Sequence, residues 1–396
     1  LSDDNLTGIG NVCKNLIESL YRIDKETKFT ILLKGGTEHL NINSSSWDFI
    51  YSKKKFFTIK RNRLKADLSV EKTAFIRIQY IFFWFINAIF FLGYLSILPF
   101  ILWSRKIDVY IGLSPNFFPY IFIGNKIKRV TFLHDFIWKL FPHTMERLYR
   151  VKMVAFIKYN LRRTDFLFAN SENTKNDYIK LFRNRSKVYT TLLAADKEFY
   201  YTADNKSISA VKSKYNIDNK YIISVCTLEP RKNLDTLLKA FSLLDREQYK
   251  LVLVGEKGWI STNFYENLTS LEIRDRIIIT GYIPKEDMAP LYSGAEVFVY
   301  PSLYEGFGLP VLEAMQCGCP VIASNNSSIP EVTGDAALLL DDPKNENEML
   351  KAINKVLTDA SLRRELCKKG LNRSKMFDWD KTAEIMMDVI RNECEK

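Results

Sequence analysis

Two glutamates in the segment PSLYEGFGLPVLEAMQCG (301–318) have a spacing that suits ligand binding. A proline that suits the first turn of a helix and a glycine that suits its end predict a short helix at 310–317. Glu305 is expected just before this helix, and Glu313 in its first turn. The segment holds no metal-ligand cluster and no pair of nucleophile and base.

The chemistry of this segment points to a sugar nucleotide. The N–H groups at a helix N-terminus bind phosphate, and Gly306 and Gly308 let the backbone come close to a ligand. Ionised carboxylates accept strong hydrogen bonds from sugar hydroxyls. A diphosphate with a sugar at each end would use all of these groups.

A second segment, LEPRKN (228–233), offers two cations to the same ligand. Arg231 and Lys232 follow a predicted strand and precede a predicted helix at 233–244, which Asn233 can cap. Two cations beside a helix N-terminus would bind a diphosphate and stabilise the charge of a departing nucleoside diphosphate. An ordinary surface Arg-Lys pair is the alternative interpretation.

Strands and helices must bring these segments together, and the chain alternates between the two. Short apolar runs with helical patterns between them predict parallel sheets covered by helices, so the fold class is α/β. No GxGxxG motif follows any of the runs, which argues against a dinucleotide site. The predicted strands are 28–34, 108–113, 129–135, 165–171, 220–227, 249–255, 276–283, 296–302, 320–324 and 336–341; further helices are expected at 145–163 and 173–182.

The chain is long enough for two doubly wound domains, whose ligands normally lie in the cleft at the carboxyl ends of the strands. The polar segment 201–219 reads as the passage between them. We expect an N-terminal acceptor-binding domain over 1–200 and a C-terminal nucleotide-sugar-binding domain over 201–375. The remainder, 376–396, is expected to be a helix that crosses back to the first domain.

Charge is distributed unevenly along the chain, whose formal net charge is +11. Residues 1–200 carry 32 Lys and Arg against 17 Asp and Glu, whereas residues 201–396 carry 25 against 29. The basic half suggests an anionic partner such as membrane lipid or a pyrophosphate-linked substrate; solubility is the simpler explanation. Nucleic acid is not expected, because no recognition motif accompanies the charge.

The six cysteines form no CxxC pair, so we expect reduced thiols in a cytosolic protein. Cys317 and Cys319 could ligate a metal, but three histidines in the whole chain make a metal site a weak expectation.

An apolar stretch at 78–103 contains no charged residue and has basic residues on both sides. Its length would suffice to span a bilayer. Polar residues, Gly93 and Pro99 interrupt it, and basic flanks on both sides give no orientation. Three interpretations stay open: a helix or hairpin that dips into one leaflet, which we favour, a helix buried in the first domain, and a span.

Taken together, these motifs resemble the retaining GT-B glycosyltransferases of family 4, the glycosyl transferases group 1. EGFGLPVLE (305–313) is similar to that family's E-x7-E motif, and LEPRKN to its phosphate-binding turn. The likeness extends over most of the chain. Its other matching segments are TGIGNV (7–12), LHDF (133–136), ANSENTK (169–175) and FDWDKTA (377–383).

The resemblance assigns roles to individual residues. It implies that Glu305 contacts the transferred sugar, Glu313 the ribose, and Arg231 with Lys232 the diphosphate. It places His134 at the donor sugar, although a core histidine at a strand end is the alternative. The remaining implied donor-binding residues are Gly8 and Gly10 in an N-terminal glycine loop, Gly281 and Tyr282 near the base, and Gly306, Phe307, Gly308 and Leu309.

The implied reaction is transfer of a hexose, perhaps mannose as in surface-polysaccharide assembly, from a GDP- or UDP-linked donor. Configuration would be retained, with no metal, resident cofactor or protein nucleophile. The expected acceptor is a lipid-linked saccharide or polysaccharide, and the expected location is the inner face of a membrane. The alternatives are a phosphorylase, a sugar-nucleotide epimerase or a non-catalytic assembly subunit. The strand that opens the family's first domain is expected to be missing, since TGIGNV begins at residue 7.

Overall fold

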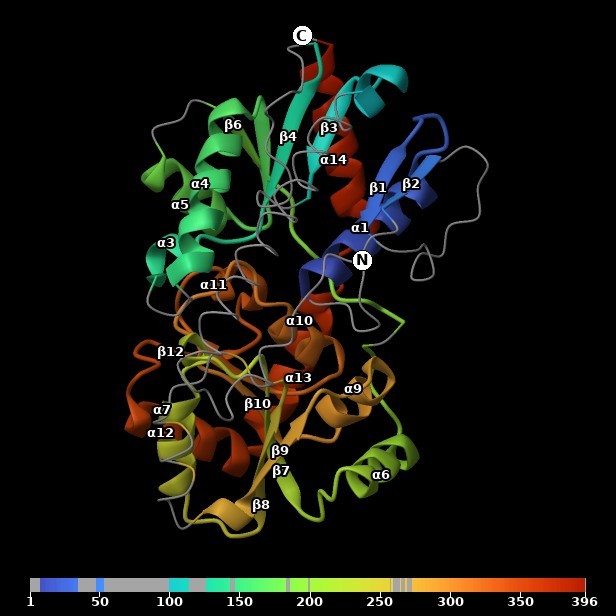
Figure 1. Cartoon of the computed structure of the whole chain (residues 1–396). Coiled ribbons are helices and arrows are strands. Elements are labelled where there is room, and N and C mark those ends of the chain that lie inside the picture. The colour runs from blue at the N-terminus through green and yellow to red at the C-terminus, as the bar shows by residue number, and fades with distance from the viewer. Residues whose placement is uncertain are drawn as a thin grey trace, which may run out of the picture. The chain divides into compact units, whose positions relative to one another are not determined.

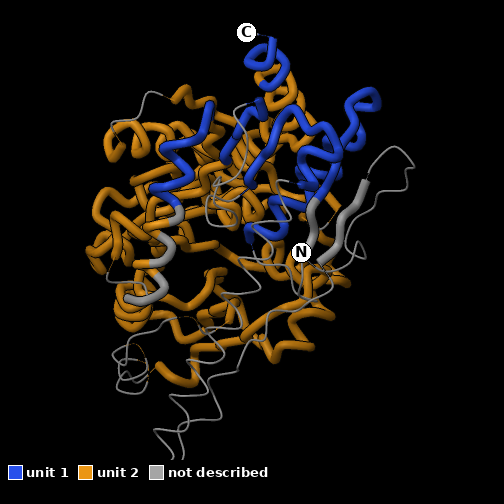
Figure 2. Tube along the Cα trace, turned by 45° about the horizontal axis from the view of Figure 1, so that its top comes forward, with its two compact units in different colours: residues 1–131, 156–166, 390–396 blue, residues 132–155, 167–389 orange. Residues whose placement is uncertain are grey.

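A computed structural model describes the chain in two compact units (Figure 2). Unit 1 comprises residues 1–131, 156–166 and 390–396; unit 2 comprises residues 132–155 and 167–389. The predicted domain boundaries stay predictions. The described residues are 8–34, 48–52, 100–113, 126–142, 147–182, 186–198, 200–256, 258, 264, 268 and 273–395.

Unit 2 contains a six-stranded sheet in the order β12-β11-β10-β7-β8-β9, and every pairing is parallel (Figure 1). From β7 the sheet extends through β8 and β9 on one side and through β10, β11 and β12 on the other. This is the doubly wound order, with its topological switch point between β7 and β10. The strands are β7 (Lys220–Val225), β8 (Tyr249–Val254), β9 (Ile277–Gly281), β10 (Val297–Tyr300), β11 (Val321–Ser324) and β12 (Leu338–Leu340).

The strands of this sheet are buried on both faces, as a parallel sheet requires. Ile222 and Phe298 are fully buried on the paired central strands β7 and β10. Helices cover the sheet in packed pairs: α7 packs against α12, and α10 packs against α13. The helices are α6 (Asn205–Lys214), α7 (Leu234–Ser242), α9 (Lys285–Ser293), α10 (Leu309–Gln316), α11 (Ile329–Thr333), α12 (Glu346–Thr358) and α13 (Ala360–Ser374).

A four-stranded sheet has the order β3-β4-β5-β6, and β3 and β4 pair in parallel. All four residues of β5 are buried, which matches its uninterrupted apolar sequence. The strands are β3 (Val109–Gly112), β4 (Lys128–Leu133), β5 (Phe166–Ala169) and β6 (Lys187–Thr190); the helices in this part of the chain are α3 (Ile137–Leu140), α4 (Arg147–Arg163) and α5 (Glu172–Leu181).

In unit 1, helix α1 (Gly8–Ile23) buries Leu16 and Leu20. Strands β1 (Thr30–Lys34) and β2 (Asp48–Ser52) form a separate parallel pair. Asp24, at the end of α1, accepts a hydrogen bond from Thr27 and pairs with Arg391 at 2.8 Å. Arg391 belongs to α14 (Trp379–Cys394), the last helix of the chain.

The structure contains all ten predicted strands, with ends shifted by a few residues. It also contains the predicted helices at 145–163, 173–182, 233–244, 310–317 and 376–396. The unexpected elements are strands β2 and β6 and helices α3, α6, α9 and α11. The segment 201–219 was predicted to be an interdomain passage, but it folds as α6 within unit 2. Asp204 caps this helix through Ser207 N–H, and Val211 is buried.

Most of the apolar stretch, residues 78–99, lies outside the described residues. Where the structure does describe the chain, no helix combines the length and hydropathy that crossing a bilayer requires. Phe100 and Trp103, which end the stretch, are exposed in unit 1. All six cysteines are free thiols, as predicted.

Candidate active site

The predicted binding segments meet at the switch point of the six-stranded sheet. Arg231 and Lys232 follow β7, and Glu305 follows β10, its neighbour in the sheet. Because the two strands are parallel, both loops leave the same edge, where doubly wound folds bind ligands. The sheet order therefore explains how residues more than 70 positions apart in the chain come together.

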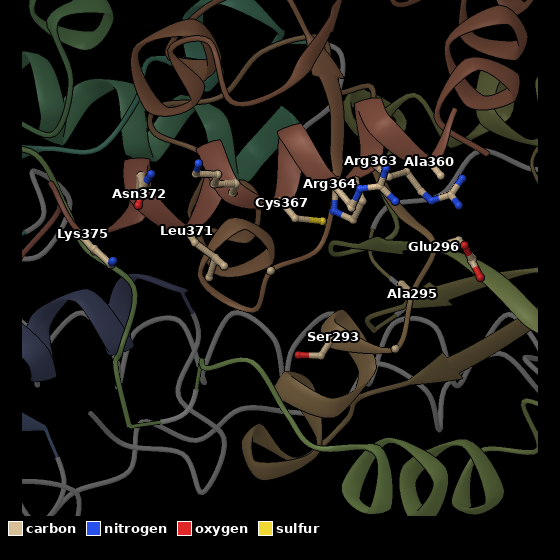
Figure 3. Close-up of a pocket in the computed structure, with 14 residues that line it drawn as sticks. Ser293, Ala295, Glu296, Ala360, Arg363, Arg364, Cys367, Leu371, Asn372 and Lys375 are labelled. Carbon is tan, nitrogen blue, oxygen red and sulfur yellow. The ribbon is translucent and has the colours of Figure 1, made fainter. Parts of the chain in front are cut away.

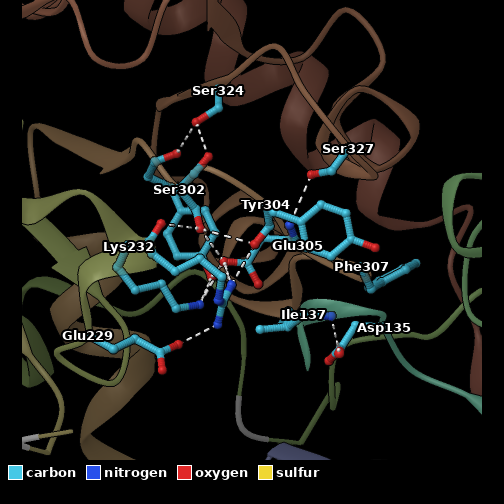
Figure 4. A network of polar contacts seen from close by, with 12 residues as sticks. Asp135, Ile137, Glu229, Lys232, Ser302, Tyr304, Glu305, Phe307, Ser324 and Ser327 are labelled. Atoms are coloured by element: carbon cyan, nitrogen blue, oxygen red, sulfur yellow. Dashed lines mark hydrogen bonds and ion pairs between the residues drawn. The ribbon is translucent and has the colours of Figure 1, made fainter. Parts of the chain in front are cut away.

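Glu305 forms the centre of a buried ionic cluster (Figure 4). Lys232 Nζ lies 2.7 Å from Glu305 Oε1, and Arg231 Nη1 lies 2.8 Å from the same oxygen. The hydroxyls of Tyr300 and Ser302 also donate to Oε1. Each of the three charged residues is 7–8 % exposed.

The cluster keeps Glu305 ionised. Burial raises the pKa of this carboxyl, but Arg231, Lys232 and the hydrogen bonds outweigh burial and lower the pKa to about 2. All four contacts reach Oε1. No residue that the structure describes donates a hydrogen bond to Oε2, so this oxygen retains its capacity to accept from a ligand.

Arg231 contacts a second carboxylate as well. Its Nη2 pairs with Glu229 and its Nη1 donates to the backbone oxygen of Tyr304. Burial lowers the pKa of Arg231, but Glu305 and Glu229 outweigh that effect and raise it above its usual value. Arg231 is therefore a permanent cation, held in place from two sides.

Asn233 connects these cations to α7, although not through the predicted cap. It occupies the N-cap position in a left-handed conformation with a φ of 57°, and its side chain makes no capping hydrogen bond. Its Nδ2 donates instead to the backbone oxygens of Pro301 and Pro343. The residue therefore connects the loop after β7 to the loops after β10 and β12.

The loop after β10 is held by hydroxyl groups from the end of β11 and from the loop that follows it. Ser328 donates to the backbone oxygens of Glu305 and Phe307, and Ser327 accepts from the backbone N–H of Glu305. Ser324 donates to the backbone oxygen of Ser302 at 2.7 Å. These bonds fix the backbone on both sides of Glu305.

Two positions in this loop favour glycine, one for steric reasons and one because of its backbone conformation. A Cβ on Gly306 would lie 1.8 Å from the backbone oxygen of His134, so no other residue fits there. Gly308 has a φ of 104° and occupies the N-cap position of α10. The predicted helix at 310–317 is confirmed as α10, and Gly318 has the left-handed conformation of a helix end, with a φ of 72°.

His134 and Asp135 follow β4 and lie against the same loop. The backbone oxygen of His134 touches Gly306 and accepts a hydrogen bond from Asn170 at 2.9 Å. Asp135 Oδ1 accepts from the backbone N–H of Ile137. Burial raises the pKa of Asp135, and the positive charge of Arg231 partly opposes that shift.

Glu313 was predicted to lie in the first turn of the helix, and this is wrong. Since α10 begins at Leu309, Glu313 is one turn further along, and the first turn contains no acidic residue. Its carboxylate accepts from the hydroxyl of Tyr292 at 3.1 Å and is hydrogen-bonded to Tyr200. Burial raises the pKa of Glu313 to about 7, against the lowering effect of these hydroxyls and of Lys285.

The other predicted residues are placed as follows. Gly281 ends β9 at the same sheet edge, with a φ of 72°, and Tyr282 after it is exposed. Phe307 is buried and packs edge-on against Phe377. Leu309 is the first residue of α10. Gly8 and Gly10 were predicted to lie in a loop, but they lie in the first turn of helix α1, in unit 1.

Several residues of the cluster were not expected from the sequence. Glu229 and Asp135 lie in quoted motifs, two residues before Arg231 and one after His134, but nothing in their types distinguishes them from surface acids. Their proximity to Arg231 is a tertiary fact. The same holds for the serines at 302, 327 and 328, which a sequence displays only as polar loop residues.

A pocket of about 700 Å³ lies elsewhere in unit 2, as Figure 3 shows. Its lining includes Glu296 and Pro320, which precede β10 and β11, and Arg364 and Lys368 of α13. It is thus at the amino edge of the sheet and contains none of the predicted site residues. Within the described ranges, no group of three or more potential metal ligands occurs.

Sequence comparison identifies one family and several relatives. The family described as Glycosyl transferases group 1 matches residues 206–373. The O-antigen chain mannosyltransferase B of Escherichia coli is 34 % identical over 283 residues, which cover 70 % of this chain and 72 % of that protein.

Comparison with solved structures gives the same fold over nearly the whole chain. Sucrose-phosphate synthase from Thermosynechococcus elongatus has a TM-score of 0.71 at 20 % identity and covers 98 % of this chain and 93 % of its own. The Anabaena protein HepE, solved with UDP and glucose, has a TM-score of 0.69 at 15 % identity, with coverage of 99 % and 98 %. The fold is GT-B, with two parallel-sheet domains of Rossmann type.

Proposed function

Because the chain belongs to the glycosyl transferases group 1 family, we propose that it transfers a hexose from a nucleotide-sugar donor to an acceptor hydroxyl with retention of configuration. One observation carries the proposal. Two buried cations, Arg231 and Lys232, share one oxygen of Glu305 at the switch point of the sheet, while its other oxygen accepts from no described residue. This arrangement suits a diphosphate and an adjacent sugar.

The proposed donor site uses the cations and the two glutamates differently. Arg231 and Lys232 bind the diphosphate, and Glu305 Oε2 accepts hydrogen bonds from hydroxyls of the transferred sugar. Glu313 accepts from the ribose, and the loop after β9, at Gly281, faces the base. The diphosphate would share the two cations with Glu305, and their positive charge would offset part of the negative charge that it brings.

The proposed chemistry needs no resident cofactor, metal or protein nucleophile. The bond from the sugar's anomeric carbon to the diphosphate oxygen breaks, and its electron pair leaves with the diphosphate. The acceptor hydroxyl attacks from the same face and passes its proton to the departing diphosphate. Arg231 and Lys232 stabilise the charge that develops on the leaving group, an electrostatic effect that is strong in a buried site.

The sugar and the acceptor are proposed from similarity. The Escherichia coli relative is an O-antigen chain mannosyltransferase, which supports mannose as the sugar and a lipid-linked saccharide or polysaccharide as the acceptor. HepE was solved with UDP and glucose, so a UDP-linked hexose is an alternative donor that must also be tested. The basic N-terminal half, together with exposed Phe100 and Trp103, supports contact with the cytoplasmic face of a membrane.

A donor screen by thermal unfolding tests the proposal. Native protein is heated with millimolar GDP-mannose, UDP-glucose, GDP or UDP. A ligand at 100 times its Kd stabilises the native state by roughly 2.7 kcal/mol, which raises the Tm by several degrees. The nucleotide that does so is then supplied as labelled donor with a lipid-linked saccharide extract, and NMR of the product gives the anomeric configuration.

Two variants locate the binding. Arg231→Gln should abolish the nucleotide-dependent Tm shift, whereas Lys220→Gln should preserve it, because Lys220 pairs with Glu296 at the far edge of the sheet. If no nucleotide shifts the Tm of the folded wild type, or if the two variants behave alike, the proposed donor site is wrong.

A further inference from the structure

The first turn of α5 and the residue before it contact two loops of the proposed active site, those after β10 and β4. Ser171, its N-cap, donates to the backbone oxygen of Gly306 at 2.7 Å and accepts from the N–H of Thr174. The hydroxyl of Thr174 donates to the same Gly306 oxygen at 3.2 Å. One helical turn therefore fixes the backbone directly after Glu305.

Asn170, the residue before this turn, reaches the other loop. Its Nδ2 donates to the backbone oxygen of His134 at 2.9 Å, the same oxygen that packs against Gly306. Asn170 is 3 % exposed, and its Oδ1 has no hydrogen-bond partner among the described residues. A buried amide that leaves one group unpaired costs stability, so its position is better explained by what it holds than by folding.

Two carboxylates complete the contacts of α5. Asp177, one turn along, accepts from the hydroxyl of Tyr304, the residue before Glu305, at 2.7 Å. Glu331 of α11 accepts from the backbone N–H groups of Glu172 and Asn173 at 2.7 and 2.6 Å. Helix α11 directly follows the serines that hold the Glu305 backbone, so α5 is linked to the third site loop as well.

We propose that Asn170, Ser171 and Asp177 form a brace that positions the His134 and Glu305 loops against each other for glycosyl transfer. These three are positioning residues, since they touch backbone or a neighbouring side chain rather than substrate. The inference rests on the proposed function for its catalytic meaning. The mechanical part, that α5 fixes the loop at 302–308, can be tested without any substrate.

If α5 acts as a brace, loosening it should lower the rate of transfer more than the affinity for the nucleotide. Arg231 and Lys232 have partners that do not depend on α5: Glu229 pairs with Arg231, and Tyr300 accepts from Lys232. Their other partners, Glu305 and the backbone of Tyr304, lie in the braced loop. Loosening the brace should therefore disturb the position of Glu305 and His134 relative to the sugar more than it weakens diphosphate binding. Small misplacements of this kind lower the rate by about 10- to 100-fold.

The first experiment is amide hydrogen exchange on the full chain. Asn170→Ala and Ser171→Ala should raise exchange in peptides covering 133–136 and 302–308 by about tenfold or more, because exchange follows local opening. Asn345→Ala is the matched control: Asn345 caps α12 through the N–H groups of Asn347 and Glu348 and touches neither loop. Equal exchange in brace and control variants would overturn the brace.

The second experiment measures kcat for hexose transfer and the Kd of the nucleoside diphosphate. Both alanine variants should lower kcat by about 10- to 100-fold and leave Kd within about threefold. Ser171→Thr keeps a hydroxyl and should restore the rate, while Asn170→Asp keeps the shape, loses the donated hydrogen bond and should not. Parallel losses of kcat and affinity, or no rescue by threonine, would contradict positioning.

A third variant protects the test against misfolding. Tyr304→Phe removes only the hydroxyl that donates to Asp177. It should lower kcat, but by less than the alanine variants do, and it remains a test of the brace if those variants unfold. A Tyr304→Phe enzyme with wild-type kcat and wild-type exchange at 302–308 would overturn the proposal. If wild-type protein binds no nucleotide, the proposed function fails, and the exchange experiment still decides whether the brace exists.

Discussion

The two oxygens of Glu305 have different surroundings, and this difference suggests how one residue serves both structure and ligand binding. Glu305, through Oε1, and Glu229 together balance the charges of Arg231 and Lys232, so the cations can be buried without a ligand. Oε2 faces no described donor. Replacing the carboxylate therefore removes both the internal partner of the cations and the proposed acceptor for sugar hydroxyls.

Glu305→Gln should lower the free energy of unfolding by about 3 kcal/mol, because it leaves two buried cations without their shared anion. It should also lower the transfer rate by about 100-fold or more. Urea unfolding and a transfer assay measure the two effects. Glu296→Gln is the control, since it breaks a pair with the exposed Lys220 and should cost at most about 1 kcal/mol. Equal costs would argue against a buried cluster.

Glu313 differs from Glu305 in its charge partners and therefore in its titration. It is hydrogen-bonded to the hydroxyls of Tyr200 and Tyr292, and Lys285, the cation that acts on it, is already paired with Asp196. Burial dominates and raises its pKa from 4.5 to about 7. At pH values between 4.5 and about 7, Glu313 is therefore protonated in the native state and ionised in the unfolded state. Its contribution to the free energy of unfolding falls as the pH rises through this range.

A comparison of the wild type with Glu313→Gln over pH 5 to 8 checks this titration. The variant has no ionisable group at this position, so it should gain stability relative to the wild type by about 2–3 kcal/mol as the pH rises from 5 to 7. Above the raised pKa the difference should become constant. Urea unfolding at each pH gives the value, and a difference that does not vary with pH would exclude the raised pKa.

At the scale of elements, the site depends on how closely loops approach one another. The loops after β4 and β10 meet where a glycine lets the His134 backbone oxygen reach the Gly306 backbone. The loops after β7 and β10 are joined by Asn233, and the loops after β10 and β11 by serine hydroxyls. Backbone contacts of this kind are intolerant of added atoms.

Gly306→Ala should lower the transfer rate by about 100-fold or more, because its Cβ would overlap the His134 backbone oxygen and force the loops apart. Gly334→Ala is a matched control. Gly334 has a φ of 53°, but its Cβ would meet only the flexible side chain of Arg373 at 3.4 Å. The control should cost about 1–3 kcal/mol of stability and little activity, because an alanine is strained at this backbone conformation. Steady-state kinetics of both variants distinguish loop displacement from ordinary glycine strain.

At the scale of the whole molecule, the two halves of the chain have opposite character. The N-terminal half is strongly basic, and Phe100 and Trp103, at the end of its apolar stretch, are exposed. Aromatic residues beside basic ones are typical of proteins that bind the surface of anionic membranes. The C-terminal half is slightly acidic and carries the proposed donor site.

The protein should sediment with vesicles that contain anionic lipid and stay in solution with neutral vesicles at low salt. Binding should weaken between 0.05 and 0.5 M salt, because screening reduces the attraction of exposed charges. Neutralising Lys53–Lys55 together with an interruption of residues 82–91 should reduce recovery several-fold. Unchanged recovery would remove membrane contact from the proposal, while the donor site would be unaffected.

The sequence by itself determined the α/β class, nearly every strand, the helix after Glu305 and the identity of the main charged residues. These follow from local causes: apolar runs form buried strands, proline and glycine mark helix ends, and glycine permits close backbone approach. Motifs at fixed spacing then pointed to one family. Local pattern failed at α6, where a polar sequence folded as a helix because Asp204 caps it and Val211 is buried.

Only the tertiary structure decided which charges meet. The order of parallel strands brings the loops after β7 and β10 together, so that Arg231 and Lys232 share an oxygen of Glu305. It also turns Glu313 toward tyrosines and places Asn170 and Ser171 on two site loops. Charge pairing and burial depend on distances in space between residues far apart in the chain, and these distances set both pKa values and hydrogen bonds.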